Sequence, residues 1–206
     1  MTAATTAQGR GCDGCTACCR IPPIVEADVQ KSASATCVHC IVGVGCGIYE
    51  TRYEVCRRFM CDWVLEESIG QHWRPIDSNM VLATDDDTAT LVVHVDSAHP
   101  QAWRQPPFIG DLRAWAASPT ATRRRVLIRT GDDFTIIFPN GERFIGPMRA
   151  DQALLVHKIE TTFWTAYDAE IVDSTDPRAG RAIGRPRTPT PGARSLDLPA
   201  SPGPPR

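Results

Sequence analysis

Hydrophobic and polar residues are grouped in short blocks in the middle of the chain, and these blocks predict a sheet with one helix. Residues 89–95 (ATLVVHV) are rich in β-branched side chains and are bounded by acidic residues, which indicates a strand. Downstream, Gln105-Pro106-Pro107 opens a predicted short helix. Phe108, Leu112 and Trp115 have the spacing that places them on one face of that helix.

The next apolar blocks predict a run of strands. Residues 125–130 and 134–138 are two of them, and Asn140-Gly141 predicts a hairpin turn because both residues tolerate a positive φ. A further strand is expected at 142–145. We expect Gly146-Pro147 to end it.

Residues 153–172 fit two patterns. Leu155, Ile159, Phe163 and Tyr167 have the spacing of a helical stripe, but the segment is dense in Thr, Ile, Val and aromatic residues. We favour a β-hairpin over a helix here.

The blocks divide the chain into four parts. Residues 1–11 are expected to be a disordered leader, 12–75 a cysteine-cluster module, 76–172 a small mixed α/β unit and 173–206 a disordered tail. The tail holds eight of the 17 prolines and carries six Arg against three Asp, a composition that is typical of disorder. The predicted fold class is α+β: a small irregular Cys-rich module followed by a β-rich unit with one short helix.

Composition narrows the possible functions. The chain has 206 residues and a formal net charge of −2, which argues against a general nucleic-acid or membrane-surface binder. No apolar run approaches the ~20 residues of a spanning helix. The first ten residues lack the apolar segment of a secretory signal, so we expect a cytoplasmic protein.

All nine cysteines lie in one window of the predicted module. They are Cys12, Cys15, Cys18, Cys19, Cys37, Cys40, Cys46, Cys56 and Cys61. Thiolates are the softest protein ligands, and Cys-x2-Cys spacings let two sulfurs reach one metal ion. The odd number and the expected cytoplasmic location argue against disulfides. We therefore interpret the module as a metal site that binds zinc or iron.

The spacing leaves the kind of metal open. Cys12, Cys15 and Cys18 repeat every third residue, as the first ligands of bacterial ferredoxins do, which favours an iron–sulfur cluster. Eight thiols would alternatively fill two four-coordinate zinc sites. Side chains of the adjacent Cys18 and Cys19 point in different directions, so we expect them to serve different metals or different vertices. His39 is more often a loop residue than a ligand in this context.

Basic residues flank the cysteines and could offset the charge of several thiolates. They are Arg20, Arg52, Arg57 and Arg58. No pattern of a zinc hydrolase, a deaminase or a phosphate-binding loop occurs, so whether the protein is an enzyme stays open.

The module closely resembles the YkgJ-type cysteine-cluster family, a putative zinc- or iron-chelating domain. The match rests on Cys12-x2-Cys15-x2-Cys18-Cys19-Arg20, on Cys37 and Cys46, on Ile48-Tyr49-Glu50-x-Arg52 and on Cys56-Arg57-x-Phe59-x-Cys61-x-Trp63. The resemblance implies eight ligands, and it leaves Cys40 as the extra thiol. Where the family usually has Arg-Pro, this chain has Arg52-Tyr53.

Three functional hypotheses follow. The first is a zinc- or iron-chelating protein whose metal organises the module. The second is an iron–sulfur redox protein that assists electron transfer or a radical enzyme. The third is a zinc-stabilised module that binds a protein partner of unknown identity.

Overall fold

The computed structural model describes residues 9–12, 14–85, 88–120, 125–149, 151–179 and the backbone of 183–184. It combines short helices with a five-stranded and a three-stranded sheet, which confirms the α+β class. The predicted leader 1–11 lies largely outside the described residues, and so does most of the predicted tail.

The larger sheet has the strand order β5-β6-β7-β8-β9. Its strands are β5 (Met80–Asp85), β6 (Thr90–Val95), β7 (Arg125–Thr130), β8 (Asp133–Phe138) and β9 (Gly141–Pro147). Neighbouring strands are antiparallel except for β6 and β7, which are parallel. The four strands predicted between residues 89 and 145 are all present.

A helix covers one face of this sheet. Because parallel strands need a crossover, the chain between β6 and β7 runs through η3 (Ala102–Arg104) and α5 (Phe108–Ala117), the predicted helix. Leu112 of α5 is completely buried, with Val93 and Ile128 in the same core. All six residues of β6 are buried, as expected for a strand that is covered on both faces.

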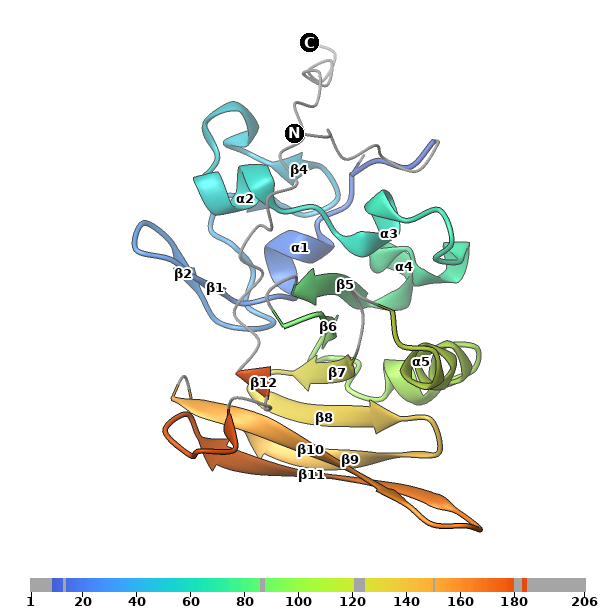
Figure 1. Cartoon of the computed structure of the whole chain (residues 1–206). Helices are drawn as coiled ribbons and strands as arrows, with labels where there is room; N and C mark the ends of the chain where they lie inside the picture. The colour runs from blue at the N-terminus through green and yellow to red at the C-terminus, as the bar shows by residue number, and fades with distance from the viewer. Residues whose placement is uncertain are drawn as a thin grey trace.

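The second layer is the predicted β-hairpin. Strands β10 (Gln152–Glu160) and β11 (Thr165–Asp173) pair along their whole length, and β12 (Ile183–Gly184) pairs with β10. Figure 1 shows the hairpin lying beside β8 and β9. Leu154 and Ala169 of the hairpin pack against Leu127 and Ile136 of the larger sheet, on the face opposite α5.

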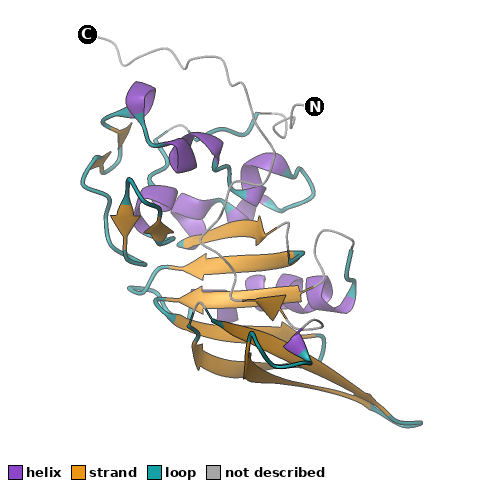
Figure 2. Ribbon diagram, turned by 60° about the vertical axis from the view of Figure 1, so that its left-hand side comes forward, coloured by secondary structure: helices purple, strands orange, loops and turns teal. Residues whose placement is uncertain are grey.

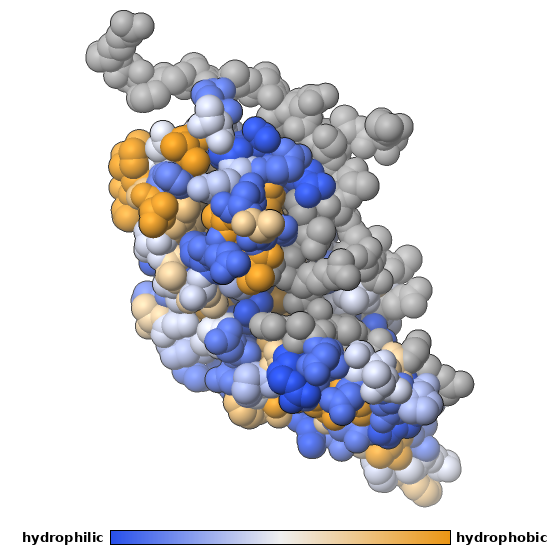
Figure 3. All heavy atoms as spheres, turned by 90° about the vertical axis from the view of Figure 1, so that its left-hand side faces the viewer, coloured by the Kyte–Doolittle hydropathy of each residue, from blue (hydrophilic) through white to orange (hydrophobic). Residues whose placement is uncertain are grey.

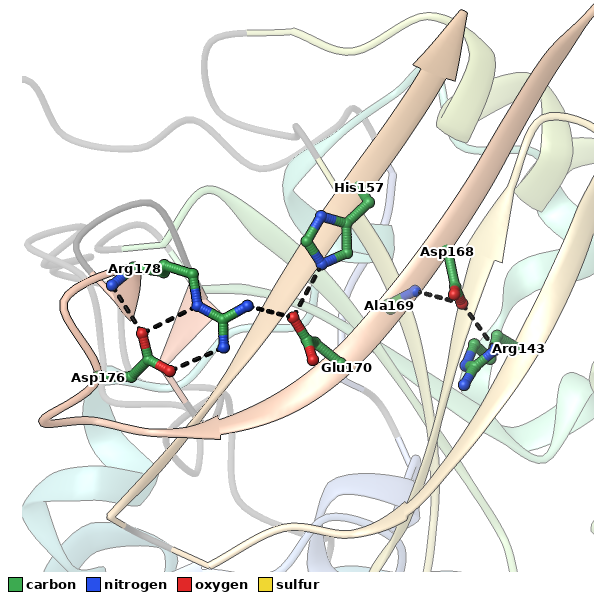
Figure 4. A network of polar contacts seen from close by, with 7 residues as sticks. All are labelled: Arg143, His157, Asp168, Ala169, Glu170, Asp176 and Arg178. Atoms are coloured by element: carbon green, nitrogen blue, oxygen red, sulfur yellow. Dashed lines mark hydrogen bonds and ion pairs between the residues drawn. The ribbon is translucent and has the colours of Figure 1, made fainter.

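Exposed side chains of the hairpin and of neighbouring segments form a polar network. Glu170 accepts from His157 (3.0 Å) and from Arg178 (2.7 Å), and Asp168 pairs with Arg143 (2.6 Å; Figure 4). Asp176 holds Arg178 in turn. Ion pairs this exposed add little to stability, so the apolar contacts carry the packing of this layer.

The structure differs from the sequence-based predictions in one strand end and one missed strand. Strand β9 ends at Pro147 rather than at Ile145: Gly146, at φ +80°, takes part in a β-bulge opposite Phe134 and Thr135. Trp164 is 55% exposed at the hairpin tip, although aromatic side chains usually pack in cores. Strand β5, at the edge of the sheet, was not predicted.

The cysteine module consists of short elements. They are α1 (Ala17–Arg20), β1 (Ile24–Val25), β2 (Gln30–Lys31), β3 (Cys40–Ile41), β4 (Gly45–Cys46), η1 (Tyr49–Thr51), α2 (Glu54–Arg58), α3 (Asp62–Leu65), η2 (Gln71–Trp73) and α4 (Pro75–Ser78). Figure 2 shows these elements gathered at one end of the five-stranded sheet.

Part of the module shares a core with the sheet. Ala17 and Ile21 near α1, and Trp63 and Val64 of α3, are buried together with residues of β5 and β6. Two polar contacts fasten the same elements. Asp62 accepts from the Thr84 hydroxyl (2.6 Å), and Arg20 pairs with the buried Asp96 (3.0 Å).

Candidate metal centre

The nine cysteines lie on four segments of the module. Cys18 and Cys19 lie on α1, Cys40 and Cys46 on the β3–β4 hairpin, and Cys56 on α2. Cys61 directly precedes α3 and is buried, whereas Cys12 is exposed and the remaining seven are partly buried. All nine are free thiols.

Four of the thiols line one cavity. A cavity of about 40 Å³ has Cys12, Cys15, Cys18 and Cys61 in its wall, together with Met60 and Trp63 among other residues. Cys12 Sγ also lies 4.0 Å from Met60 Sδ. We call these four cysteines the α1–α3 group, because they lie on or beside those two helices.

Arg10 holds the start of this group in place. Its guanidinium donates to the backbone carbonyls of Trp63 (2.8 Å), Glu66 (3.0 Å) and Ile69 (2.7 Å), and more weakly to Glu67 (3.3 Å). It also lies 4.9 Å from the centre of the Trp63 ring. Arg10 therefore ties the segment that carries Cys12 to the segment that follows Cys61. Sequence reasoning assigned it no role, since nothing in the spacing marks an arginine that binds carbonyls.

The other five thiols form a second set, which we call the hairpin group: Cys19, Cys37, Cys40, Cys46 and Cys56. Backbone hydrogen bonds join Cys37 to Cys19 (2.9 Å) and Cys40 to Cys37 (3.0 Å). Cys40 and Cys46 face each other across β3 and β4. His39 interacts with Tyr53 (3.3 Å), which connects this loop to the start of α2, where Cys56 lies.

The adjacent Cys18 and Cys19 differ in acidity. A hydrogen bond from Cys18 lowers the pKa of Cys19 to about 6, with further help from Cys40, Lys31 and Arg52 against the effect of burial. The same contact with Cys19, together with burial and the nearby Cys12 and Cys15, raises the pKa of Cys18 well above its usual value. Each of the two thus interacts most strongly with the other, while Cys18 also has Cys12 and Cys15 as neighbours and Cys19 has Cys40.

Burial opposes ionisation of two other thiols. It raises the pKa of Cys61 to about 12 and that of Cys56 to about 11, and neighbouring thiols add to both shifts. Cys12 and Cys15 are the neighbours of Cys61, while Cys19, Cys37 and Cys46 are the neighbours of Cys56. A bound cation would offset this crowding, because metal ligation favours the thiolate.

Lys31 supplies a buried positive charge beside the hairpin group. Its ammonium donates to the carbonyls of Arg20 (3.2 Å), Pro22 and Ser32 (3.4 Å). Burial lowers the pKa of Lys31, while the nearby Cys37 and Cys19 act in the opposite direction. Sequence reasoning assigned no role to Lys31, since only the fold brings it to the thiols.

Two buried N–H donors beside the thiols have no hydrogen-bond partner among the described residues. They are Trp63 Nε1, which belongs to a residue in the cavity wall, and Arg52 Nε. Arg52 lies near the hairpin group, since its charge favours the thiolates of Cys19 and Cys56. Buried donors without partners are rare, and sulfur atoms of a loaded metal site could accept from them.

The four arginines that flank the cysteines in the sequence make different interactions. Arg20 pairs with Asp96, although its charge also favours the thiolate of Cys40. Arg57 and Arg58 both pair with Glu54 on the surface of α2. Of the four, Arg52 has the clearest position for a role beside the sulfurs.

Within the described parts of the chain, no three or more His, Cys, Asp or Glu side chains are arranged to hold a metal ion as they stand.

The described helices include none that is long and apolar enough to cross a membrane. Comparison of the chain with protein-family models, with curated proteins and with solved structures gave no match.

Proposed function

We propose that the chain is a metal-binding protein that chelates zinc or iron through the cysteines of its N-terminal module. The observation that carries the proposal is that nine free thiols lie in one module, four of them in the wall of one cavity, near buried N–H donors that lack partners among the described residues. Soft thiolates select zinc, Cu(I) and iron–sulfur clusters over hard cations. The motif resemblance to YkgJ-type cysteine-cluster proteins favours the same function.

The residues fit such a group in charge as well as in ligand type. Several thiolates around one or two cations leave a net negative charge, and Lys31 and Arg52 lie where they reduce it. Bound zinc would supply cross-links between the segments of the module, since four-coordinate zinc–thiolate sites contribute directly to folding.

An iron–sulfur cluster is the second candidate. The four thiols of the α1–α3 group line a cavity of about 40 Å³, which offers space beside them. Indole and guanidinium N–H groups also tune the reduction potential of clusters when they donate to sulfur. A redox role in electron transfer or in a radical reaction would follow.

The exposed aliphatic side chains of the β3–β4 hairpin support a variant of the first proposal, in which zinc shapes a surface for a protein partner. Val38 is 90% exposed, and Ile41, Val42 and Val44 are exposed beside it. Figure 3 shows apolar side chains gathered at the end of the molecule that carries the module.

The test is the metal and acid-labile sulfide content of protein purified anaerobically from cells supplied with both iron and zinc. About two zinc ions without sulfide, as eight thiolates would hold, support the structural role. Iron with matching sulfide supports the redox role. Protein that contains neither metal, and takes up neither zinc nor iron on reconstitution, would contradict the proposal.

A further inference from the structure

The two groups of thiols are held by different parts of the fold. Three members of the α1–α3 group share a cavity wall with Cys61, and α1 and α3 are both packed on the five-stranded sheet. The hairpin group is connected within itself, by the Cys37–Cys19 and Cys40–Cys37 backbone bonds and by the β3–β4 pairing. The adjacent Cys18 and Cys19 are the place where the groups meet.

Resting on the proposed function, we propose that the module holds two separate metal sites of four thiolates each. The first consists of Cys12, Cys15, Cys18 and Cys61, with the indole N–H of Trp63 donating to its sulfurs. The second takes four of the five thiols of the hairpin group, with Arg52 Nε as its donor.

The partnerless donors support this division because each lies beside a different group. Trp63 is 5% exposed and lies in the wall of the cavity that the first four thiols share. Arg52 stacks on Tyr49, 3.9 Å from the ring centre, in the chain segment that leads into α2 and Cys56. One shared site would be expected to leave its unpaired donors on one side only.

The two sites differ in how far the fold prepares them. Cys61 is fixed by α3, whose Asp62 is bonded to β5, and Arg10 holds the Cys12 segment against the same helix. Apart from Cys19, the thiols of the second site lie on residues 32–60, a segment in which Val55 is the only buried residue. A site whose ligand-bearing segments the fold already holds together loses less conformational entropy on binding. The first site should therefore fill first, and filling of the second should order the hairpin.

Paired substitutions in the full chain test the division. The variants are Cys12→Ser/Cys61→Ser, which leaves two thiols in the first site, and Cys46→Ser/Cys56→Ser, which leaves three in the second. Metal-free protein is titrated with Co²⁺, and the ligand-to-metal and d–d absorption bands count thiolate-bound ions. Wild type is expected to bind about two ions and each variant about one, so that each variant reaches about half of the wild-type band intensity at saturation.

The outcomes separate this inference from the proposed function. If wild type binds Co²⁺ and Zn²⁺ through thiolates but either pair of substitutions abolishes all binding, the thiols form one shared centre and the division is wrong. If wild type binds neither ion through thiolates and no iron–sulfur cluster can be reconstituted, the proposed function itself fails.

Trp63→Phe and Arg52→Lys keep all nine thiols and so test the division even if the serine variants do not fold. Trp63→Phe retains an aromatic ring and removes the N–H, while Arg52→Lys retains the charge and removes Nε. Loss of such a contact typically weakens metal affinity about 10- to 100-fold. Each variant is expected to weaken one of the two Co²⁺ steps and leave the other within about twofold. Equal weakening of both steps, or of neither, would overturn the assignment.

Discussion

Strand β6 and the segment of residues 32–60 achieve order in different ways. Every residue of β6 is buried, and Leu91, Val93 and Val95 share one core with residues of α1, α3 and α5. Between residues 32 and 60 only Val55 is buried, and the aliphatic side chains of the β3–β4 hairpin face solvent. The segment nevertheless contains four of the nine cysteines.

The difference indicates what each region needs in order to fold. Fixing the backbone of one residue costs about 1–2 kcal/mol, and burial of apolar surface is the usual compensation. The sheet has that compensation within its own sequence. Residues 32–60 have little of it, and on the proposed function cross-linking by a metal ion would supply the missing stability.

Loss of one metal ligand should have the largest effect on metal content and stability, and this effect should be confined to the cysteine module. Cys15→Ser leaves three thiols in the first site, and structural zinc sites contribute about 10–16 kcal/mol of apparent binding free energy. We expect loss of one bound ion and lower solubility. Cys40→Ser is the matched control: five thiols surround the second site and four suffice, so both ions should remain. Elemental analysis of the two variants decides the matter, and full metal loading of Cys15→Ser would show that the ligand assignment is wrong.

Truncation of a side chain in the sheet core should lower the free energy of unfolding by a smaller amount, and this amount should be the same with and without metal. Leu91 in β6 is completely buried, so Leu91→Ala should lower the free energy of unfolding by about 2–5 kcal/mol. Val42→Ala, at an exposed position of the hairpin, should change it by about 0.5 kcal/mol or less. Denaturant unfolding of metal-loaded and metal-free protein provides the measurement. An effect of Leu91→Ala that depended on metal would contradict the separation of the two regions.

Acid should destabilise the sheet through His94. Burial, and then Arg129 and Lys31, lower the pKa of this residue to about 3. The unfolded chain binds a proton below pH ~6.5 that the folded chain does not, so stability falls by about 1.4 kcal/mol per pH unit as the pH decreases from there towards 3. His94→Gln should remove this part of the pH dependence. Urea unfolding of metal-free protein at pH 7 and pH 4.5 compares the two slopes, and identical slopes would contradict burial of a neutral histidine.

The smallest effect is expected at Arg10. Arg10→Gln removes charge-assisted hydrogen bonds to backbone carbonyls, each of about 1.5–3 kcal/mol when fully buried and less here because the guanidinium is partly exposed. Arg58→Gln, which breaks an exposed pair with Glu54, should cost about 0–1 kcal/mol. Arg10→Gln should also weaken the first Co²⁺ step, whereas Arg58→Gln should not. If the two variants behaved alike, Arg10 would not position Cys12.

Sequence periodicity predicted four of the five strands of the larger sheet, because their residues follow the rules of burial. The strands from Thr90 to Ile145 and the helix from Phe108 were predicted, as was the hairpin of β10 and β11. Strand β5 was missed because it forms at the edge of the sheet and is confirmed only by its pairing with β6. The bulge at Gly146 was taken for a strand end, since glycine permits both.

The candidate centre was only partly accessible from the sequence. Spacing identified all nine cysteines as candidate ligands, and their assignment to metal remains a prediction. The sequence predicted that Cys18 and Cys19 serve different metals or different vertices, but which thiols lie near each of them depends on how α1 packs. The positions of Arg10, Lys31 and Trp63 depend on contacts between segments far apart in the chain. Such contacts leave no local pattern.

The most direct test of this account is hydrogen exchange of the full chain, metal-loaded and after removal of metal by a chelator under reducing conditions. We predict that amides of residues 32–60 lose their protection when the metal is removed, while amides of β6 and β7 keep theirs. Equal loss in the sheet and the module, or unchanged protection of residues 32–60, would contradict the claim that metal stabilises this segment and apolar burial stabilises the sheet.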